Sequence, residues 1–182
     1  MGGLRQPLPV KLFVGMLSPD PGLFDSCSQQ LAIRYGTVDR QSDDSPWDHS
    51  DYYQDEMGSG LLRRFIVFTK TIDPGELPAV KLEALRLERG WGEERAGGLK
   101  RRINIDPGYV TEAKVVLATT KDVPHRIYIS SGIYAEATLH DVRERQGFQP
   151  LPHTYPDFRA AATLQLFHDV RADLRRALQG ER

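Results

Sequence analysis

The chain has 182 residues, of which 40% are hydrophobic and 27% are charged, and its 24 basic and 25 acidic side chains leave a net charge of −1. This length and balance predict one domain whose core needs no disulfide or metal. The charge balance argues against general nucleic-acid binding through a strongly basic surface. Cys27 is the only cysteine, which excludes an intramolecular disulfide and a cysteine-rich zinc site and is typical of a reducing compartment.

The beginning of the chain gives no indication of a membrane or export signal. Its apolar run, residues 12–17, is too short for a membrane span or for the core of a signal peptide. Gln6 stands where a myristoylation signal has Ser or Thr. We therefore expect a cytoplasmic protein with no membrane partner.

The first third of the chain predicts a strand, a helix and a long loop. Residues 10–17 form a nearly continuous apolar run, which indicates a strand buried on both faces. Residues 23–35 carry apolar side chains that suit a helix, and Gly36 follows where a C-cap glycine is favoured. The polar stretch 37–60 is too long for a simple connection, so we interpret it as a functional loop with a short strand near 52–57.

This loop also contains side chains that can bind metals, at Asp48, His49, Asp51 and Glu56. Their spacing matches no standard metal motif, so an acidic surface is the simpler interpretation and we predict no metal site. The aromatic residues of the loop argue against disorder. Tyr52 and Tyr53 either stack on a ligand or pack into the core.

The middle of the chain alternates between strand and helix patterns. Residues 64–71 predict a strand, and residues 77–89 predict a helix on which Lys81 and Glu88 share one face. The glycine-rich, charged stretch 90–100 predicts an exposed turn. Residues 102–106 predict a strand that ends at Asp106-Pro-Gly.

The last third begins with an ambiguous segment. Residues 112–120 suit a short helix or a strand, and we favour the helix because it gives a strand–helix–strand step. Residues 125–140 alternate strongly and predict a hairpin, or one long strand with a bulge at Gly132. A final amphipathic helix is expected over 158–178, with Asp157 as its N-cap.

These elements predict an α/β fold. We expect a single domain over residues 1–182, with its core in 9–178 and a mixed sheet of about five to six strands flanked by helices. The order of the strands and the oligomeric state are not fixed by these patterns.

Several motifs of the chain are similar to those of one known family. They are Asn104-Ile-Asp-Pro-Gly-Tyr, His125-Arg-Ile-Tyr, Gly132-Ile-Tyr-Ala-Glu and Thr154-Tyr-Pro-Asp. In this order they resemble the prokaryotic domain-of-unknown-function family 4416, and the resemblance covers nearly the whole chain. It implies a free-standing cytosolic protein of this size, and it implies no activity and no catalytic roles.

A cationic turn is the first candidate site. Lys121, His125 and Arg126 surround the start of a predicted strand, where they would bind an anionic ligand. The simpler alternative is a solvated loop with a surface ion pair to Asp122.

Two carboxylates are the candidates for catalysis beside this turn. Asp106 ends a predicted strand, and Asn104 lies on the same strand face. Glu136 lies between two alanines in a strand, so it either faces solvent or pairs with Lys81, Lys121 or Arg126. A paired Glu136 facing a cleft would act as a general base or a metal ligand.

Our assignment of site residues follows from these patterns. The catalytic candidates are Asp106, His125 and Glu136, and the ligand-binding candidates are Lys81, Asn104, Lys121, Arg126 and Tyr134. The chain has no P-loop, no dinucleotide-binding glycine motif and no Gly-x-Ser-x-Gly elbow, so no cofactor is identified. His140, His153 and His168 have no partner at a diagnostic spacing.

Three functions are compatible with these residues. The first is an enzyme, a hydrolase or transferase, that acts on an anionic or nucleotide-like small molecule in a polar pocket at the sheet edge. The second is a non-catalytic module that binds a ligand or RNA through the same turn. The third is a protein-interaction domain without a small-molecule site.

Overall fold

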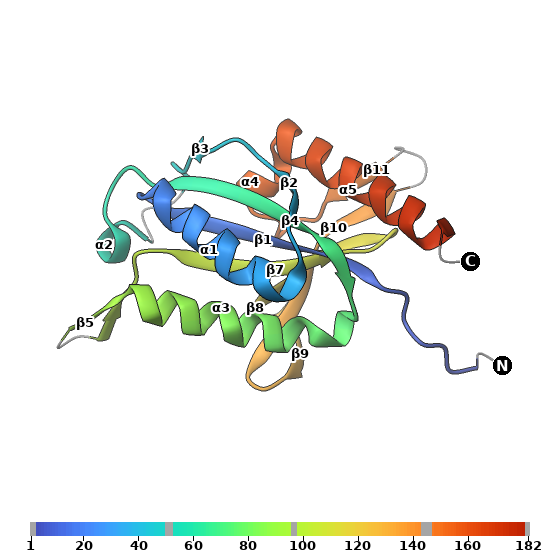
Figure 1. The fold of residues 1–182 in the computed structure, drawn as a ribbon, viewed down its shortest axis with the longest axis horizontal. Helices are drawn as coiled ribbons and strands as arrows, with labels where there is room; N and C mark the ends of the chain where they lie inside the picture. The colour runs from blue at the N-terminus through green and yellow to red at the C-terminus, as the bar shows by residue number, and fades with distance from the viewer. Residues whose placement is uncertain (1–2, 50–52, 96–97, 143–146, 181–182) are drawn as a thin grey trace.

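The computed structural model describes residues 3–49, 53–95, 98–142 and 147–180 of the chain (Figure 1). Within these ranges nine strands form one main sheet, in the order β11-β10-β8-β7-β1-β4-β2, with β3 paired to β4 and β9 paired to β10. The strands are β1 (Val10–Ser18), β2 (Val38–Gln41), β3 (Ser45–Pro46), β4 (Leu62–Ile72), β7 (Asn104–Val110), β8 (Lys114–Thr119), β9 (Ile127–Ser130), β10 (Ile133–Val142) and β11 (Gly147–Pro150).

Helices and a small hairpin complete the fold. The helices are α1 (Pro21–Tyr35), α2 (Gln54–Met57), α3 (Leu77–Trp91), α4 (Pro156–Arg159) and α5 (Ala161–Gly180), and a 3-10 turn, η2 (Pro74–Glu76), precedes α3. The hairpin consists of β5 (Glu93–Arg95) and β6 (Gly98–Lys100). Among the described residues, no helix combines the length and the apolar composition needed to cross a bilayer.

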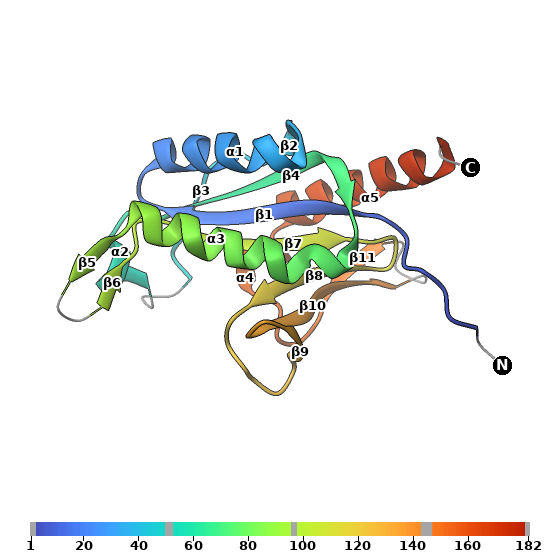
Figure 2. The ribbon, with the colours of Figure 1, turned by 60° about the horizontal axis from the view of Figure 1, so that its bottom comes forward.

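Helices cover both faces of the main sheet (Figures 1 and 2). On one face, α1 and α3 pack against alternate residues of β1, such as Leu12, Val14 and Met16. On the other face, Phe13 of β1 joins a cluster that includes Phe158 of α4 and Phe167 of α5. All nine residues of β1 are therefore buried, as the continuous apolar run predicts.

Most of the strongly patterned elements are confirmed. The structure contains β1, α1 with Gly36 at its C-terminus, β4 and α3 where the sequence places them. The segment 125–140 forms a hairpin of β9 and β10, and Ser131 and Gly132 both have positive φ angles in its turn. The final helix is present as α5.

The sheet differs from the predicted one in two ways. All neighbouring pairs of described strands are antiparallel rather than mixed, and there are nine strands rather than five or six. The additional strands β2, β3 and β11 contain two to four residues, too few for an alternating pattern. The helix expected over 112–120 is wrong, because Val115, Val116 and Leu117 lie in β8, a strand with neighbours on both sides.

Four local predictions are also corrected. The short strand expected near 52–57 is the helix α2 in its described part, while residues 51–52 lie outside the described residues. The stretch 90–100 contains the β5–β6 hairpin rather than only a turn. The strand expected over 102–106 starts at Asn104 and continues through Pro107 to Val110. Asp157 lies inside α4 and is buried, because it pairs with an arginine of β4 rather than capping a helix.

Gly108 permits the close approach of β7 to its neighbours. A Cβ atom added there would lie 2.3 Å from the carbonyl oxygen of Val116 and 2.4 Å from the Cζ atom of Phe13. We expect Gly108→Ala to lower the free energy of unfolding by about 1–3 kcal/mol, because neither the backbone of β8 nor the buried Phe13 ring can move freely. Urea denaturation would measure this change.

Gly90→Ala is the matched control, because Gly90 lies in α3 with nothing within 4 Å of an added Cβ atom. There alanine should raise the stability by roughly 0.5–1 kcal/mol through its better helix propensity. Equal effects of the two substitutions would contradict the steric argument.

Candidate functional site

A polar pocket forms where β7 and β8 separate. The ladder between them runs from Val110 and Val115 only to Gly108 and Leu117, although both strands are described beyond that point. The N–H group of Thr111 donates to the carbonyl of Lys114, so odd-numbered residues of β7 direct their own N–H and C=O groups toward β8. Pro107 occupies the next such position after Tyr109, and proline has no N–H group to donate. Pro107 therefore ends the ladder.

Two side chains of α3 take the place of the missing strand. The N–H group of Ile105 donates to Glu88 Oε1 at 2.6 Å, and Lys81 Nζ donates to the carbonyl of Ile105 at 2.7 Å. Both side chains are buried, in line with the shared helix face predicted for them. They satisfy backbone groups that would otherwise be buried without partners.

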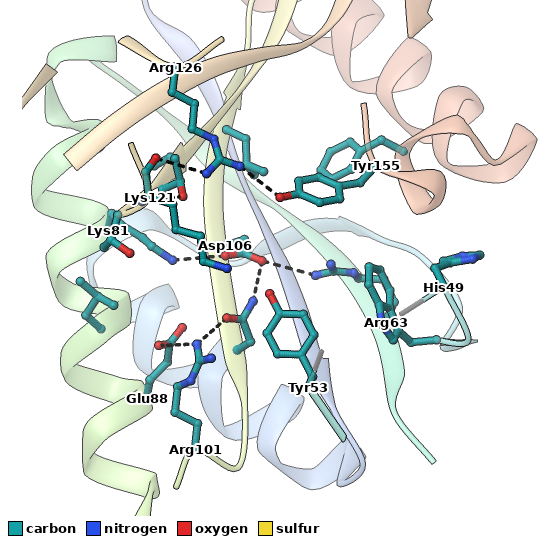
Figure 3. Close-up of a pocket in the computed structure, with 18 of the residues that line it drawn as sticks. His49, Tyr53, Arg63, Lys81, Glu88, Arg101, Asp106, Lys121, Arg126 and Tyr155 are labelled. Atoms are coloured by element: carbon teal, nitrogen blue, oxygen red, sulfur yellow. Dashed lines mark hydrogen bonds and ion pairs between the residues drawn. The ribbon is translucent and has the colours of Figure 1, made fainter. Parts of the chain in front are cut away.

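Asp106 lies in the opening, surrounded by donors (Figure 3). Its carboxylate accepts a hydrogen bond from Lys81 Nζ at 3.2 Å and one from Asn104 Nδ2 at 2.6 Å, and Arg63 Nη1 lies 3.8 Å away. Burial alone would raise the pKa of Asp106, but the charges of Lys81 and Arg63 and these hydrogen bonds outweigh it and lower the pKa. Asp106 is therefore ionised at neutral pH.

Arg101 lines the remaining side of the opening and orients Asn104 there. Its guanidinium forms two hydrogen bonds to the carboxylate of Glu56, at 2.6 and 2.7 Å, and a third at 2.7 Å to Asn104 Oδ1. Because Arg101 donates to the amide oxygen, the amide nitrogen of Asn104 is directed toward Asp106. Arg101 Nη1 also lies 3.5 Å from Glu88 Oε2. Burial raises the pKa of Glu88, with Lys81 and the Ile105 N–H group opposing that shift.

The pocket itself has a volume of about 340 Å³ and contains an excess of positive groups. Two carboxylates line it, those of Glu88 and Asp106. Five cationic side chains line it with them: Arg63, Lys81, Arg101, Lys121 and Arg126. Several of the carboxylates that balance these cations, including Glu56, Glu136 and Asp157, bind them from outside the lining.

Aromatic side chains form much of the remaining wall. The guanidinium of Arg63 lies 4.8 Å from the ring centre of Trp47 and forms an ion pair with Asp157 at 2.9 Å, without the alignment of a hydrogen bond. Tyr53 directs its hydroxyl into the pocket (Figure 3). Burial, and then the charge of Asp106, raise the pKa of Tyr53, so its phenol remains neutral.

Arg126 connects the pocket to a second polar cluster. Its Nε atom donates to Glu136 Oε2 at 2.6 Å, and its Nη2 atom donates to the hydroxyl of Tyr155 at 3.1 Å. Nη1 donates to the carbonyl of Lys121 at 3.2 Å, which holds the turn before β9 in place. Glu136 is thus buried and paired with Arg126, one of the alternatives that the sequence left open.

The structure brings five of the eight candidate residues into this pocket: Lys81, Asn104, Asp106, Lys121 and Arg126. His125 and Glu136 contact each other at 3.2 Å behind Arg126 and do not line the pocket. Tyr134 packs edge-on against Tyr128 in the β9–β10 hairpin and is also outside the lining. The pocket lies between two central strands rather than at the sheet edge.

Sequence reasoning missed several lining residues, chiefly Trp47, Arg63, Arg101 and Tyr155. One signal was present for Arg63, because it alternates with Phe65 and Val67 on a buried face of β4. A charged residue in register with buried apolar ones needs a buried partner. Arg101 and Tyr155 lie in polar loops, where no pattern indicated their roles.

Comparison with protein-family models identifies a match over nearly the whole chain. A family model for a domain of unknown function (DUF4416) covers residues 8–174. No curated protein and no solved structure matches the chain.

Removing the amine of Lys81 should destabilise the fold strongly. Lys81→Met leaves the Ile105 carbonyl without its donor and Asp106 without its nearest cation, so we expect a loss of about 3 kcal/mol in urea denaturation. Arg86→Met on the exposed face of the same helix is the control and should change stability by less than about 0.5 kcal/mol. Similar small losses in both variants would show that Lys81 does not support β7.

The lowered pKa of Asp106 predicts a pH-dependent contribution to stability. The ionised carboxylate stabilises the fold above the unfolded-state pKa, near 4, and this contribution is lost as the pH falls through the lower folded-state pKa. The stability difference between the unaltered protein and Asp106→Asn should therefore be largest near neutral pH and should shrink in acid. A difference that is constant from about pH 7 to pH 3 would contradict this.

Proposed function

The chain belongs to the DUF4416 family, and we propose that it binds an anionic small molecule in the pocket between β7 and β8. One observation carries the proposal: five cationic side chains line the pocket with only two carboxylates. A ligand with one or two negative groups would be attracted to these cations, which outnumber the carboxylates of the lining itself. Arginines held by Asp157 and Glu136 are already oriented before a ligand arrives, which lowers the entropic cost of binding.

The shape and wall of the pocket favour a small, partly aromatic ligand. A volume of about 340 Å³ lies at the lower end of the range for small-molecule sites. Trp47, Tyr53 and Tyr155 offer aromatic surface beside the charges, which suits a nucleotide-like molecule with a ring and an acidic group. The same surfaces would serve a ligand-binding module without catalysis.

As an enzyme, the protein would be a hydrolase or transferase. Asp106 is ionised and held by Lys81 and Asn104, so it would orient a water molecule or act as a nucleophile rather than as a general acid. Lys81 and Arg63 would stabilise negative charge that develops next to it in the transition state. His125 and Glu136, the other catalytic candidates, would act through Arg126, because they do not line the pocket.

The proposal can be tested by binding. We would screen nucleotides and phosphorylated metabolites by thermal shift and measure the dissociation constant of the best ligand by calorimetry. Lys121→Ala should weaken the binding of that ligand at least about tenfold, because a hydrogen bond to a charged group contributes about 1.5–3 kcal/mol. Lys121 is exposed at the pocket, so this substitution should leave the fold intact.

Lys114→Ala is the matched control, because it removes the same charge at the start of β8, outside the pocket lining. It should bind the ligand as tightly as the unaltered protein. Equal weakening by both substitutions would show that general charge attraction, rather than the pocket, binds the ligand. Binding of RNA with a steep salt dependence, in the absence of any small-molecule hit, would favour the RNA-binding alternative.

A further inference from the structure

A second cluster, made of His125, Glu136 and His153, lies behind Arg126. His125 precedes β9, Glu136 lies on β10 and His153 lies in the loop between β11 and α4. The two strands pair Ile127 with Ala135, which brings the turn before β9 next to Glu136. The loop before α4 is held on β10 by Thr154, whose hydroxyl donates to the carbonyl of Thr138. Three segments thus converge at one point.

The hydrogen bonds of His153 leave one of its nitrogens able to bind a metal. His153 Nε2 lies 2.9 Å from the carbonyl oxygen of Ala137. A carbonyl can only accept, so Nε2 carries the proton, and Nδ1 of the neutral ring has a free electron pair. A backbone carbonyl that fixes the tautomer of a histidine in this way is the usual outer partner of a metal-binding imidazole. The ring of His125 stacks on that of His153 with 4.2 Å between centres.

Glu136 provides an independent indication of a ligand. Its side chain is fully buried, and Oε2 contacts both Arg126 Nε, at 2.6 Å, and His125 Nε2, at 3.2 Å. Oε1 is buried and has no hydrogen-bond partner among the described residues. A buried carboxylate oxygen without a donor is costly, and coordination to a cation would remove that cost.

The distances are compatible with metal binding after a small movement. One ligand atom from each of the three residues lies within 4.8 Å of the others, and His125 Nε2 lies 3.2 Å from Glu136 Oε2. Ligand atoms of a tetrahedral zinc site lie about 3.4 Å apart, given bond lengths near 2.1 Å. The rings of His125 and His153 are stacked at 17°, so His125 must also turn before the lone pairs of both rings can point at one metal. His125 is one-third exposed on a turn, which gives it room for this rotation.

We propose that His125, Glu136 and His153 form a binding site for a divalent transition metal of the zinc class, with at least one coordination position open to water or a ligand. Two imidazoles and one carboxylate favour zinc, cobalt or nickel over magnesium and calcium, which prefer oxygen ligands. Three protein ligands with an open fourth position are typical of zinc sites that hold a reactive water. Arg126 orients the carboxylate by donating to Oε2 and also lines the anion pocket, so the metal would lie near that pocket.

Cobalt is the best probe for this site. The full chain, without an affinity tag and stripped of metal, would be titrated with Co²⁺ while the visible absorption is recorded. We expect one Co²⁺ per chain, with the strong visible bands of a four- or five-coordinate site, displacement by Zn²⁺ and no displacement by Mg²⁺. His125→Gln and His153→Gln should each weaken binding at least tenfold and remove the strong bands.

His140→Gln is the matched control, because His140 lies on β10 outside the cluster and should leave the titration unchanged. Circular dichroism would show that each variant is folded, and the partly exposed His125 makes its variant the most informative. Unaltered binding in both cluster variants, or weak binding without strong bands, would overturn the proposal. The site does not depend on the proposed anion pocket, so Lys121→Ala should still bind Co²⁺ normally.

Discussion

The backbone hydrogen bonds of one residue, Ile105, support the centre of this molecule. Pro107 stops β8 from pairing with β7, and Glu88 and Lys81 of α3 then bind the backbone groups of Ile105 that β8 leaves without partners. The same amine of Lys81 binds Asp106. Buried backbone N–H and C=O groups need hydrogen-bond partners. The pocket can therefore open only because α3 supplies the charged side chains that bind these groups in its wall. Stability and site chemistry depend on the same atoms.

The charges of the site are arranged in two layers. Carboxylates of Glu56, Glu136 and Asp157 hold three arginines that line the pocket, so each of these arginines is oriented by a partner from outside the lining. Arg126 belongs to both polar centres, since it contacts Glu136 on one side and Tyr155 in the pocket on the other. A metal bound at Glu136 and an anion bound at Arg126 would therefore attract each other across a single side chain.

Local sequence patterns predicted most of the helices and strands. The pairing of those strands, which local patterns do not show, determines the pocket. The strand β1, the helices α1 and α3 and the β9–β10 hairpin carry enough alternating or helical residues to be recognised individually. Asp106-Pro-Gly looked like a turn, because the effect of Pro107 depends on which neighbouring strand its missing N–H group would face. His153 offered no signal, since only the fold brings it to His125 and Glu136. The site residues found from sequence were those inside the recognised elements and the turn next to the hairpin.

The position of β1 also constrains how the chain can fold during synthesis. This first strand pairs with β4 and β7, which lie about 50 and 95 residues later in the chain. Its neighbouring strands are therefore incomplete until residue 110 has left the ribosome, and Phe13 lacks Phe158 and Phe167 until later still. Contacts between such distant segments form slowly and leave strand edges exposed to other chains. The centre of the finished sheet is consequently assembled from segments that are made far apart in time.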